Sequence, residues 1–231
     1  MLRKLLFSVA VTGWMLQASA VTIENVMKIK EGGMEKTLNG FCENSGVTVC
    51  KDSDGSSYIL IDYASEGIQF VTVPYQKTAL SGKFLNGILS MEFKIPADKI
   101  PPKKLMLISR NAGGTRAGDV TVELHNDRNG APGNMLTVWL ETGPAKGDLR
   151  RIDMPLKATF PEGFPLNRFV KLEISWGAKG LKIDLDGKNL LFEPDYKNVM
   201  FSTPTNFTIG GAYNSPAGNL YIRNVSIAEI E

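Results

Sequence analysis

The stretch "FVKLEISWGAKGLKIDLDG", from Phe169 to Gly187, decides the fold of this chain of 231 residues. Apolar side chains occupy every second position from Val170 to Trp176, and again from Leu181 to Leu185. Successive side chains of a β-strand point to opposite faces, so the alternation predicts two strands that each bury one face. Trp176 falls on the buried face, where it is predicted to anchor the core. The Asp-Gly pair that ends the stretch is typical of a tight hairpin turn.

The same alternation recurs along most of the chain. Short apolar-polar runs are bounded by Gly, Pro, Asn or Asp, and no long stretch after residue 20 repeats with the period of a helix. The predicted strands lie within Tyr58–Ala64, Gly67–Pro74, Gly87–Pro96, Lys104–Ser109, Asp119–His125, Asn134–Glu141, Phe169–Trp176, Gly180–Gly187, Asn206–Gly211 and Asn219–Ile227. Many short strands with turn-rich links predict an all-β domain of two antiparallel sheets packed as a sandwich.

The C-terminal third resembles a known family. The stretches "NRFVKLEISWGAKGLKIDLDGKNLLF" (167–192) and "NFTIGGAYNSPAGNLYIRNVSI" (206–227) are similar to the closing strands of the concanavalin A-like lectin/glucanase superfamily, especially its laminin-G-like domains. The matching positions are Trp176, Asp186, Gly187, Gly210, Gly211, Asn224 and Val225. The resemblance covers residues 87–230 and implies a jelly roll of two curved sheets. It also implies a ligand, which is a glycan on the concave sheet in many members and lies against rim loops, often beside calcium, in others.

Two consecutive predicted strands, Asp119–His125 and Asn134–Glu141, form a hairpin with a tryptophan on its polar side. Alternation assigns their apolar side chains to the core: Val120, Val122, Leu124, Leu136, Val138 and Leu140. The opposite face then gathers Glu123, His125, Trp139 and Glu141, with Thr121 and Thr137 between them. An indole on the polar side of a strand offers a platform for the apolar face of a sugar ring. A surface loop or the other sheet covering Trp139 would explain the same pattern.

We therefore predict a glycan-binding surface on this face. Trp139 would stack on the sugar. Hydrogen bonds would come from Glu123, His125, Glu141, Asn126 and the rest of the loop to Asn134, and from Arg110 and Asn111. His125 is the only histidine of the chain, and a structural or solvated imidazole is the alternative to a functional one.

Glu123 and His125 are the candidate catalytic residues if the surface belongs to an enzyme. Family 16 glycoside hydrolases of the superfamily carry Glu-x-Asp-x-Glu on one strand, and only Glu123 of the corresponding stretch 119–123 matches. A retaining hydrolase needs two carboxyl groups about 5–5.5 Å apart, which a regular strand with this spacing does not provide. A polysaccharide lyase needs a base and groups that neutralise a uronate carboxylate. His125, Asn126, Arg110 and Asn111 have that chemistry, although the motifs typical of alginate lyases are absent.

The first twenty residues have the features of a secretory signal peptide. Arg3 and Lys4 precede an apolar run, Leu5–Leu16, and small residues occupy the positions before a cleavage site after Ala20. The run is shorter than the roughly 20 residues that span a bilayer. We expect a secreted or periplasmic protein that is not inserted in the membrane after cleavage.

The charge balance argues against two classes of partner. Removing the signal peptide takes two of the 26 basic residues, which leaves as many as the 24 acidic ones. Nucleic acids and anionic lipid surfaces are bound through clusters of Lys and Arg, and the sequence has none. We therefore expect neither as a partner.

The N-terminal segment contains both cysteines and one candidate metal site. Residues 21–57 are expected to form a strand or flap of the same domain as residues 58–231, with Cys42 and Cys50 joined as a disulfide. No organic cofactor is expected. Calcium is the one ion for which ligands are present, at Asp52 and Asp54 and at Asp127 and Asn129, and ordinary turns explain these residues equally well.

Three functions follow from the sequence. The first is a secreted, non-catalytic carbohydrate-binding sandwich that recognises a polysaccharide or glycan on its concave face. The second is a polysaccharide lyase or glycoside hydrolase that uses the same surface. The third is a protein-interaction or envelope-structural domain whose partner is another extracellular or envelope protein.

Overall fold

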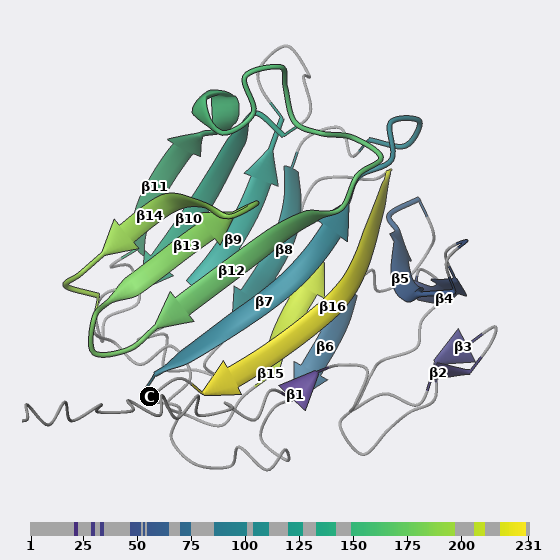
Figure 1. The fold of residues 1–231 in the computed structure, drawn as a ribbon, viewed down its shortest axis with the longest axis horizontal. Coiled ribbons are helices and arrows are strands. Elements are labelled where there is room, and N and C mark those ends of the chain that lie inside the picture. The colour runs from purple at the N-terminus through teal and green to yellow at the C-terminus, as the bar shows by residue number, and fades with distance from the viewer. Residues whose placement is uncertain are drawn as a thin grey trace, which may run out of the picture.

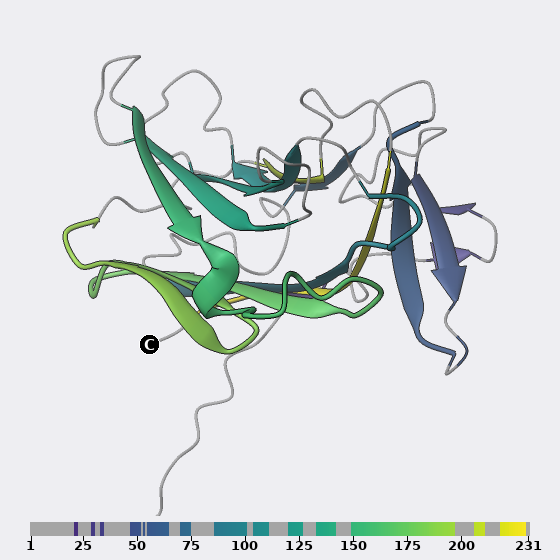
Figure 2. The same ribbon diagram turned by 90° about the horizontal axis from the view of Figure 1, so that it is seen from above.

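The chain folds into two antiparallel β-sheets packed face to face, as predicted (Figures 1 and 2). The computed structural model describes residues 21–22, 29–30, 33–34, 47–51, 53, 55–64, 70–74, 86–100, 104–110, 120–126, 133–141, 149–196, 206–210 and 218–229. Within these ranges the one helical element is the 3₁₀ turn η1 (Leu156–Ala158), and no helix has the length and apolar character needed to cross a bilayer. The all-β, jelly-roll sandwich predicted from the strand pattern is confirmed.

The larger sheet is drawn at the front of Figure 1. Its strands follow the order β14 (Lys188–Glu193), β13 (Leu181–Leu185), β12 (Val170–Trp176), β7 (Gly87–Lys94), β16 (Asn219–Glu229), β5 (Ser57–Asp62) and β4 (Val47–Lys51), with β1 (Val21–Thr22) also paired to β16. Neighbours in this sheet include strands far apart in sequence, because β7 lies between β12 and β16. The predicted strands of the C-terminal third thus enclose one from the middle of the chain.

The smaller sheet lies behind the larger one. Its order is β11 (Leu149–Pro155), β10 (Met135–Glu141), β9 (Val120–His125), β8 (Lys104–Arg110), β15 (Asn206–Gly210) and β6 (Phe70–Pro74). Two short strands, β2 (Ile29–Lys30) and β3 (Gly33–Met34), form a separate hairpin. The predicted hairpin of β9 and β10 is present, with Thr137 opposite Glu123.

The core lies between the two sheets and follows the alternation of the sequence. Leu89, Met91, Phe93 and Ile95 are buried on β7 and just after it, and the apolar positions predicted on β9, β10, β12 and β13 are buried as well. Trp176 is 2% exposed, so its predicted role as a core anchor is confirmed. It packs against Gly87, its partner across β7 and β12, where a Cβ atom would lie 2.2 Å from the indole Cζ2.

The turn between β13 and β14 has the predicted geometry. Asp186 and Gly187 both have positive φ, 53° and 77°, as the tight turns of β-hairpins require. The register of the hairpin shifts between Ile183 and Asp184, which marks a β-bulge.

The edge strands β11 and β14, one from each sheet, are joined by an ion pair. Arg150 of β11 donates two hydrogen bonds, of 2.7 and 3.0 Å, to the two carboxylate oxygens of Glu193 on β14. This ion pair links the two sheets along the edge formed by β11 and β14. The turn η1 follows β11 on the same side of the sandwich and leads toward the larger sheet (Figure 2).

Part of the N-terminal segment belongs to the larger sheet, through β4 and β1. Cys50 lies half-buried on β4 and forms no disulfide with a described residue, and Cys42 lies outside the described residues, so the Cys42–Cys50 disulfide stays a prediction. Residues 1–20 and the cleavage site also lie outside them.

Candidate functional site

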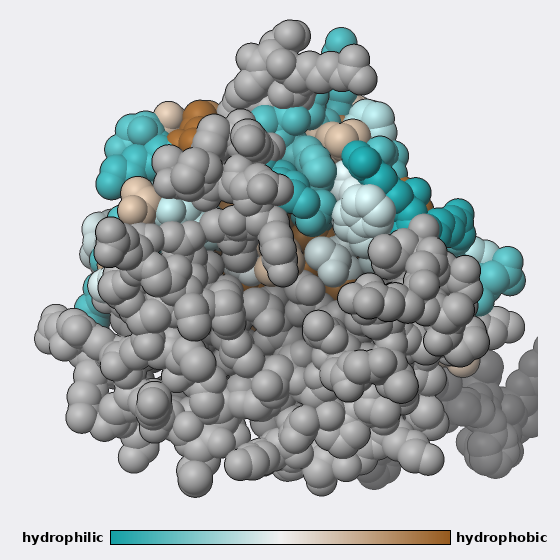
Figure 3. All heavy atoms as spheres, turned by 180° about the vertical axis from the view of Figure 1, so that it is seen from behind, coloured by the Kyte–Doolittle hydropathy of each residue, from teal (hydrophilic) through white to brown (hydrophobic). Residues whose placement is uncertain are grey.

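The outer face of β8–β11, which points away from the larger sheet, carries the predicted functional side chains and is called the polar face below. The strand registers arrange its positions in rows: Lys104, His125 and Met135 in the first, Met106, Glu123, Thr137 and Asp153 in the second, and Thr121, Trp139 and Arg151 in the third. Seen from behind, the described side chains that reach the surface near β10 and β11 are mainly hydrophilic (Figure 3). The polar face therefore carries mostly polar side chains, of which Glu123 and Thr137 are buried.

Glu123 is the centre of this face. Its Oε1 accepts a hydrogen bond of 2.9 Å from Nζ of Lys104, and its Oε2 accepts one of 3.0 Å from the indole Nε1 of Trp139. His125 Nε2 lies 3.0 Å from the same Oε2. We call these four residues the Glu123 cluster. Three of them come from the predicted hairpin, and Lys104 comes from the adjacent strand β8.

The surroundings of Glu123 hold its carboxyl group in the ionised form. Glu123 is 5% exposed, and burial by itself would raise the pKa of the carboxyl group. Hydrogen bonds from His125, Lys104 and Trp139, together with the charge of Lys104, outweigh burial and lower the pKa of Glu123 from 4.5 to about 2. An ionised carboxylate only accepts hydrogen bonds, so Nε2 of His125 carries the hydrogen and donates it. The network therefore fixes the orientation and tautomer of the imidazole.

Trp139 lies on the polar face, as predicted, and not in the core. It is half-buried, whereas its neighbours in the strand, Val138 and Leu140, are fully buried between the sheets. The hydrogen bond to Glu123 holds the indole at one edge, and the Arg151 guanidinium carbon lies 5.3 Å from its ring centroid. The indole is thus fixed in place before any ligand arrives.

A second network lies beside the Glu123 cluster. Thr137 is fully buried and donates a hydrogen bond of 2.7 Å to Oδ1 of Asp153, and Arg151 Nε donates one of 2.9 Å to the same oxygen. Hydrogen bonds from Arg151 and Thr137 lower the pKa of the Asp153 carboxyl group. Both described carboxylates of this part of the polar face are thus held ionised by donors.

Other predicted site residues are placed less directly at this surface. Asn126 follows β9, and its Oδ1 accepts a hydrogen bond of 3.1 Å from the backbone N–H of Gly133, which ties the two ends of the loop together. Arg110 and Glu141 are the last residues of β8 and β10, and the structure describes only their backbone. Asn111 and the calcium candidates Asp52, Asp54, Asp127 and Asn129 lie outside the described residues. Across all the described ranges, no three His, Cys, Asp or Glu side chains lie close enough to hold a metal ion together.

The sequence prediction missed Lys104, Arg151 and Asp153. Arg151 and Asp153 alternate with Ile152 and Met154 in "LRRIDMP", so the same period-two signal that identified β10 was present in β11. Two adjacent arginines and a terminal proline obscured it. Lys104 was placed in a predicted strand, but only the pairing of β8 with β9 shows that it reaches Glu123.

The electrostatics of the polar face do not suit Glu123 or Asp153 to the role of general acid in glycoside hydrolysis. Hydrolases of this type need one carboxyl group with a raised pKa to protonate the leaving group. Glu123 has a lowered pKa, and so has Asp153.

The comparisons with known proteins support the architecture. No protein-family model and no curated protein matches the chain. Among solved structures, the receptor-binding domain of botulinum neurotoxin D is similar with a TM-score of 0.54 and 14% identity over 79% of this chain and 43% of that one. The binding domain of botulinum neurotoxin DC in complex with rat synaptotagmin II is similar with a TM-score of 0.54 and 14% identity over 87% of this chain and 48% of that one.

A family 7 alginate lyase in complex with its substrate is similar over most of both chains. The TM-score is 0.53 and the identity 10%, over 82% of this chain and 84% of the lyase. The chain spans less than half the length of the two neurotoxin domains. At these identities the likeness shows the fold, which is an antiparallel β-sandwich shared by binding domains and by a polysaccharide lyase.

Proposed function

We propose that this chain is a concanavalin A-like sandwich that binds a glycan through its polar face without cleaving it. The observation that carries the proposal is the position of Trp139, which stands on the outer face of the sheet and is held there by Glu123. An aromatic ring fixed beside charged and hydrogen-bonding side chains is the usual composition of a sugar-binding surface. Because the ring is held before binding, less conformational entropy is lost when the ligand stacks on it.

The remaining polar groups give this surface its hydrogen-bonding capacity. Lys104 and Arg151 keep part of their side chains in solvent, with 27% and 44% exposure. Both are already paired to carboxylates, so the surface has balanced charge and suits hydroxyl groups as well as an acidic sugar. The alginate lyase complex shows that a sandwich of this shape can hold an oligosaccharide, and in this chain that property is part of the proposal.

Replacing Trp139 with alanine is expected to weaken glycan binding at least tenfold, because stacking on an aromatic ring contributes about 1.5 kcal/mol. Affinity electrophoresis against a panel of neutral and uronate polysaccharides measures the effect. Trp139→Phe, which keeps an aromatic face and loses the hydrogen bond to Glu123, should retain most of the binding. Equal retardation of the parent chain and Trp139→Ala in every gel would refute the proposed surface.

Failure of every polysaccharide to retard the parent chain would favour the protein-interaction function. One neurotoxin domain of this shape is seen in complex with a protein, synaptotagmin. The matching experiment is co-purification with envelope or extracellular proteins, in which a specific partner lost in Trp139→Ala would assign the polar face to that partner.

Lyase activity is the second candidate function, and the orientation of His125 is the observation that favours it. With its hydrogen on Nε2 and donated to Glu123, a neutral imidazole presents the lone pair of Nδ1 as a base. Such a base could remove the proton next to a uronate carboxylate. Ultraviolet absorbance of the unsaturated product measures the reaction. His125→Ala is then expected to abolish product formation, and an active His125→Ala variant would exclude this role.

A further inference from the structure

The outer face of the larger sheet carries a second cluster, on the opposite side of the sandwich from the polar face. Lys94, the last residue of β7, extends its ammonium group among three aromatic rings. Its Nζ lies 5.4 Å from the ring centroid of Tyr58, 4.8 Å from that of Phe169 and 4.8 Å from that of Tyr221. The rings come from β5, from the residue that precedes β12, and from β16. We call these four residues the Lys94 cage.

The rings of the cage support one another. Tyr58 and Tyr221 meet edge to face, with centroids 5.2 Å apart, and Tyr58 and Phe169 do so at 6.5 Å. All four cage residues are half-buried, so each keeps part of its side chain at the surface. The cage is therefore an ordered aromatic site with an accessible side, and a single cation stands at its centre.

The charge of Lys94 is not balanced within the cage. Among the described residues, Lys94 has no carboxylate partner, and its recorded contacts are those with the three rings. Arg223 lies 3.9 Å above the centroid of Phe169, and its Nε donates a hydrogen bond of 2.6 Å to Glu92. Lys94 and Arg223 contribute two positive charges and Glu92 contributes one negative charge, so these three side chains together carry a net charge of +1. Aromatic rings attract an ammonium group but accept its N–H hydrogens poorly, so an anion on the open side would improve its coordination.

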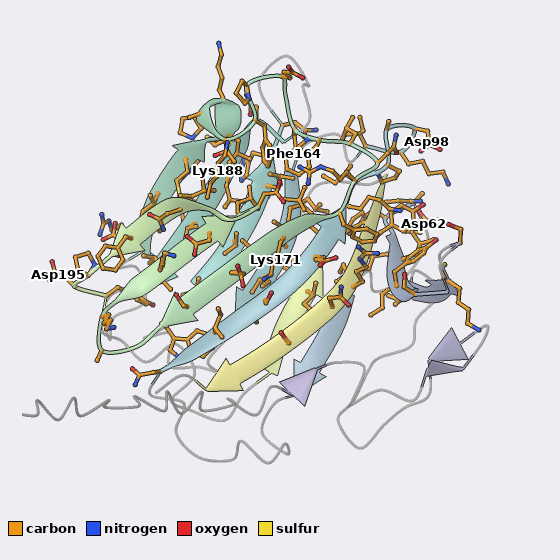
Figure 4. The ribbon with its side chains drawn as sticks, viewed as in Figure 1. Asp62, Asp98, Phe164, Lys171, Lys188 and Asp195 are labelled. Atoms are coloured by element: carbon orange, nitrogen blue, oxygen red, sulfur yellow. The ribbon has the colours of Figure 1, made fainter. Side chains whose placement is uncertain are left out.

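Lys171 shows the usual arrangement of a lysine on the same sheet. It lies on β12, on the face turned toward the viewer in Figure 4, and its Nζ is 2.7 Å from Oε1 of Glu173. Lys171 has a carboxylate partner and no cation–π contact with a described aromatic ring, so it is a matched reference for Lys94.

We propose that the Lys94 cage binds the carboxylate or sulfate group of an acidic sugar residue in an anionic polysaccharide. Such a residue carries its anionic group on a rigid ring that also has an apolar C–H face. The anion would pair with the Lys94 ammonium while the C–H face contacts the rims of the tyrosine rings. An acidic peptide side chain offers the carboxylate at the end of a flexible chain without a comparable apolar face, so it uses the aromatic rims less well.

This site is independent of the proposed function, since it lies on the other sheet and shares no residue with the Glu123 cluster. Where both sites operate, one chain could hold two stretches of polysaccharide, and binding to a polymer would be stronger than to a short oligosaccharide.

The test is isothermal titration of the full chain with a uronate oligosaccharide and with the same oligosaccharide after reduction of its carboxyl groups. Trp139→Ala serves as the background, because it removes the stacking residue of the polar face. In this background the uronate oligosaccharide should still bind, and the reduced one should bind at least tenfold more weakly. Lys94→Met, which keeps an unbranched side chain one atom shorter and removes its charge, should weaken uronate binding at least tenfold, and Lys171→Met should leave it unchanged.

Two further measurements separate a lost site from a damaged fold. Lys94→Arg keeps the charge within the rings and should retain binding, and thermal unfolding verifies that each variant is folded. The proposal would be overturned if folded Lys94→Met bound the uronate oligosaccharide as tightly as the Trp139→Ala background does. It would also be overturned if the Trp139→Ala background bound the reduced oligosaccharide as tightly as the uronate one. Binding of oligoglutamate as tightly as the uronate oligosaccharide would assign the cage to acidic peptides instead. If the Trp139→Ala background itself no longer bound the uronate oligosaccharide, the binding would belong to the polar face, and an independent site at the Lys94 cage would be refuted.

Discussion

Glu123→Gln is expected to lower the free energy of unfolding at neutral pH by about 3 kcal/mol, because it removes the one charge that balances a buried network. Lys104, His125 and Trp139 all donate to this carboxylate. A glutamine side chain offers a single acceptor oxygen, and its NH₂ group would face donors. Urea-induced unfolding measures the difference. Glu162→Gln, at an exposed position on the loop after η1, is the matched control and should change stability by less than about 0.5 kcal/mol.

The same substitution should change the acid sensitivity of the fold. The pKa of Glu123 is lowered from 4.5 in the unfolded chain to about 2 in the folded protein. The carboxylate therefore contributes its full stabilisation above about pH 4.5, and this contribution is lost as the pH falls toward 2. The stability difference between the parent chain and Glu123→Gln should consequently shrink over this range. A constant difference would show that the stabilisation comes from packing and not from the charge.

Gly87→Ala is expected to destabilise the fold by about 3 kcal/mol, although alanine suits a β-strand better than glycine does. The added Cβ would lie 2.2 Å from Cζ2 of Trp176. The indole is 2% exposed and cannot move aside without disturbing the core between the sheets. Thermal and denaturant unfolding measure the loss.

Gly163→Ala is the control for the effect of a methyl group by itself. Gly163 has a φ of 100°, yet a Cβ there would have no heavy atom within 4 Å. Its substitution should cost about 1 kcal/mol, from backbone strain alone. A loss at Gly87 no larger than the loss at Gly163 would mean that the indole yields to the methyl group, and the packing described for Trp176 would then be wrong.

The alternation of apolar residues was sufficient to predict the fold class and most of the core. It succeeded for β7, β9, β10, β12 and β13 because each buries one face against the other sheet. It missed β11 and β14, which are edge strands rich in charged residues and have less to bury. The order of the strands was not predictable, since contacts such as β7 with β16 join segments more than 100 residues apart, and local patterns carry no information on them.

The sequence predicted the part of the site that lies on the β9–β10 hairpin. Glu123, His125 and Trp139 lie on two strands joined by a short loop, so their proximity follows from period two alone. Their relation to one another differs from the expectation of three side chains open to a ligand. The Glu123 carboxylate accepts hydrogen bonds from three side chains, one of which, Lys104, comes from β8. The hydroxyl group of Thr137 donates its hydrogen bond to Asp153 of β11. These contacts depend on strands whose neighbours only the folded chain defines.

The bulge and the ion pair on β14 have a consequence for self-association. β14 ends the larger sheet among the described strands, and it carries Phe192, which is 54% exposed. An uncovered strand edge with an apolar side chain invites a second molecule to extend the sheet. The bulge beside Asp184 twists this edge, and Lys188 and Glu193 place charges at its two ends, with Glu193 held by Arg150. A strand added along β14 by another molecule would have to accommodate both the twist and these charges, so the two features disfavour extension of the sheet at this edge.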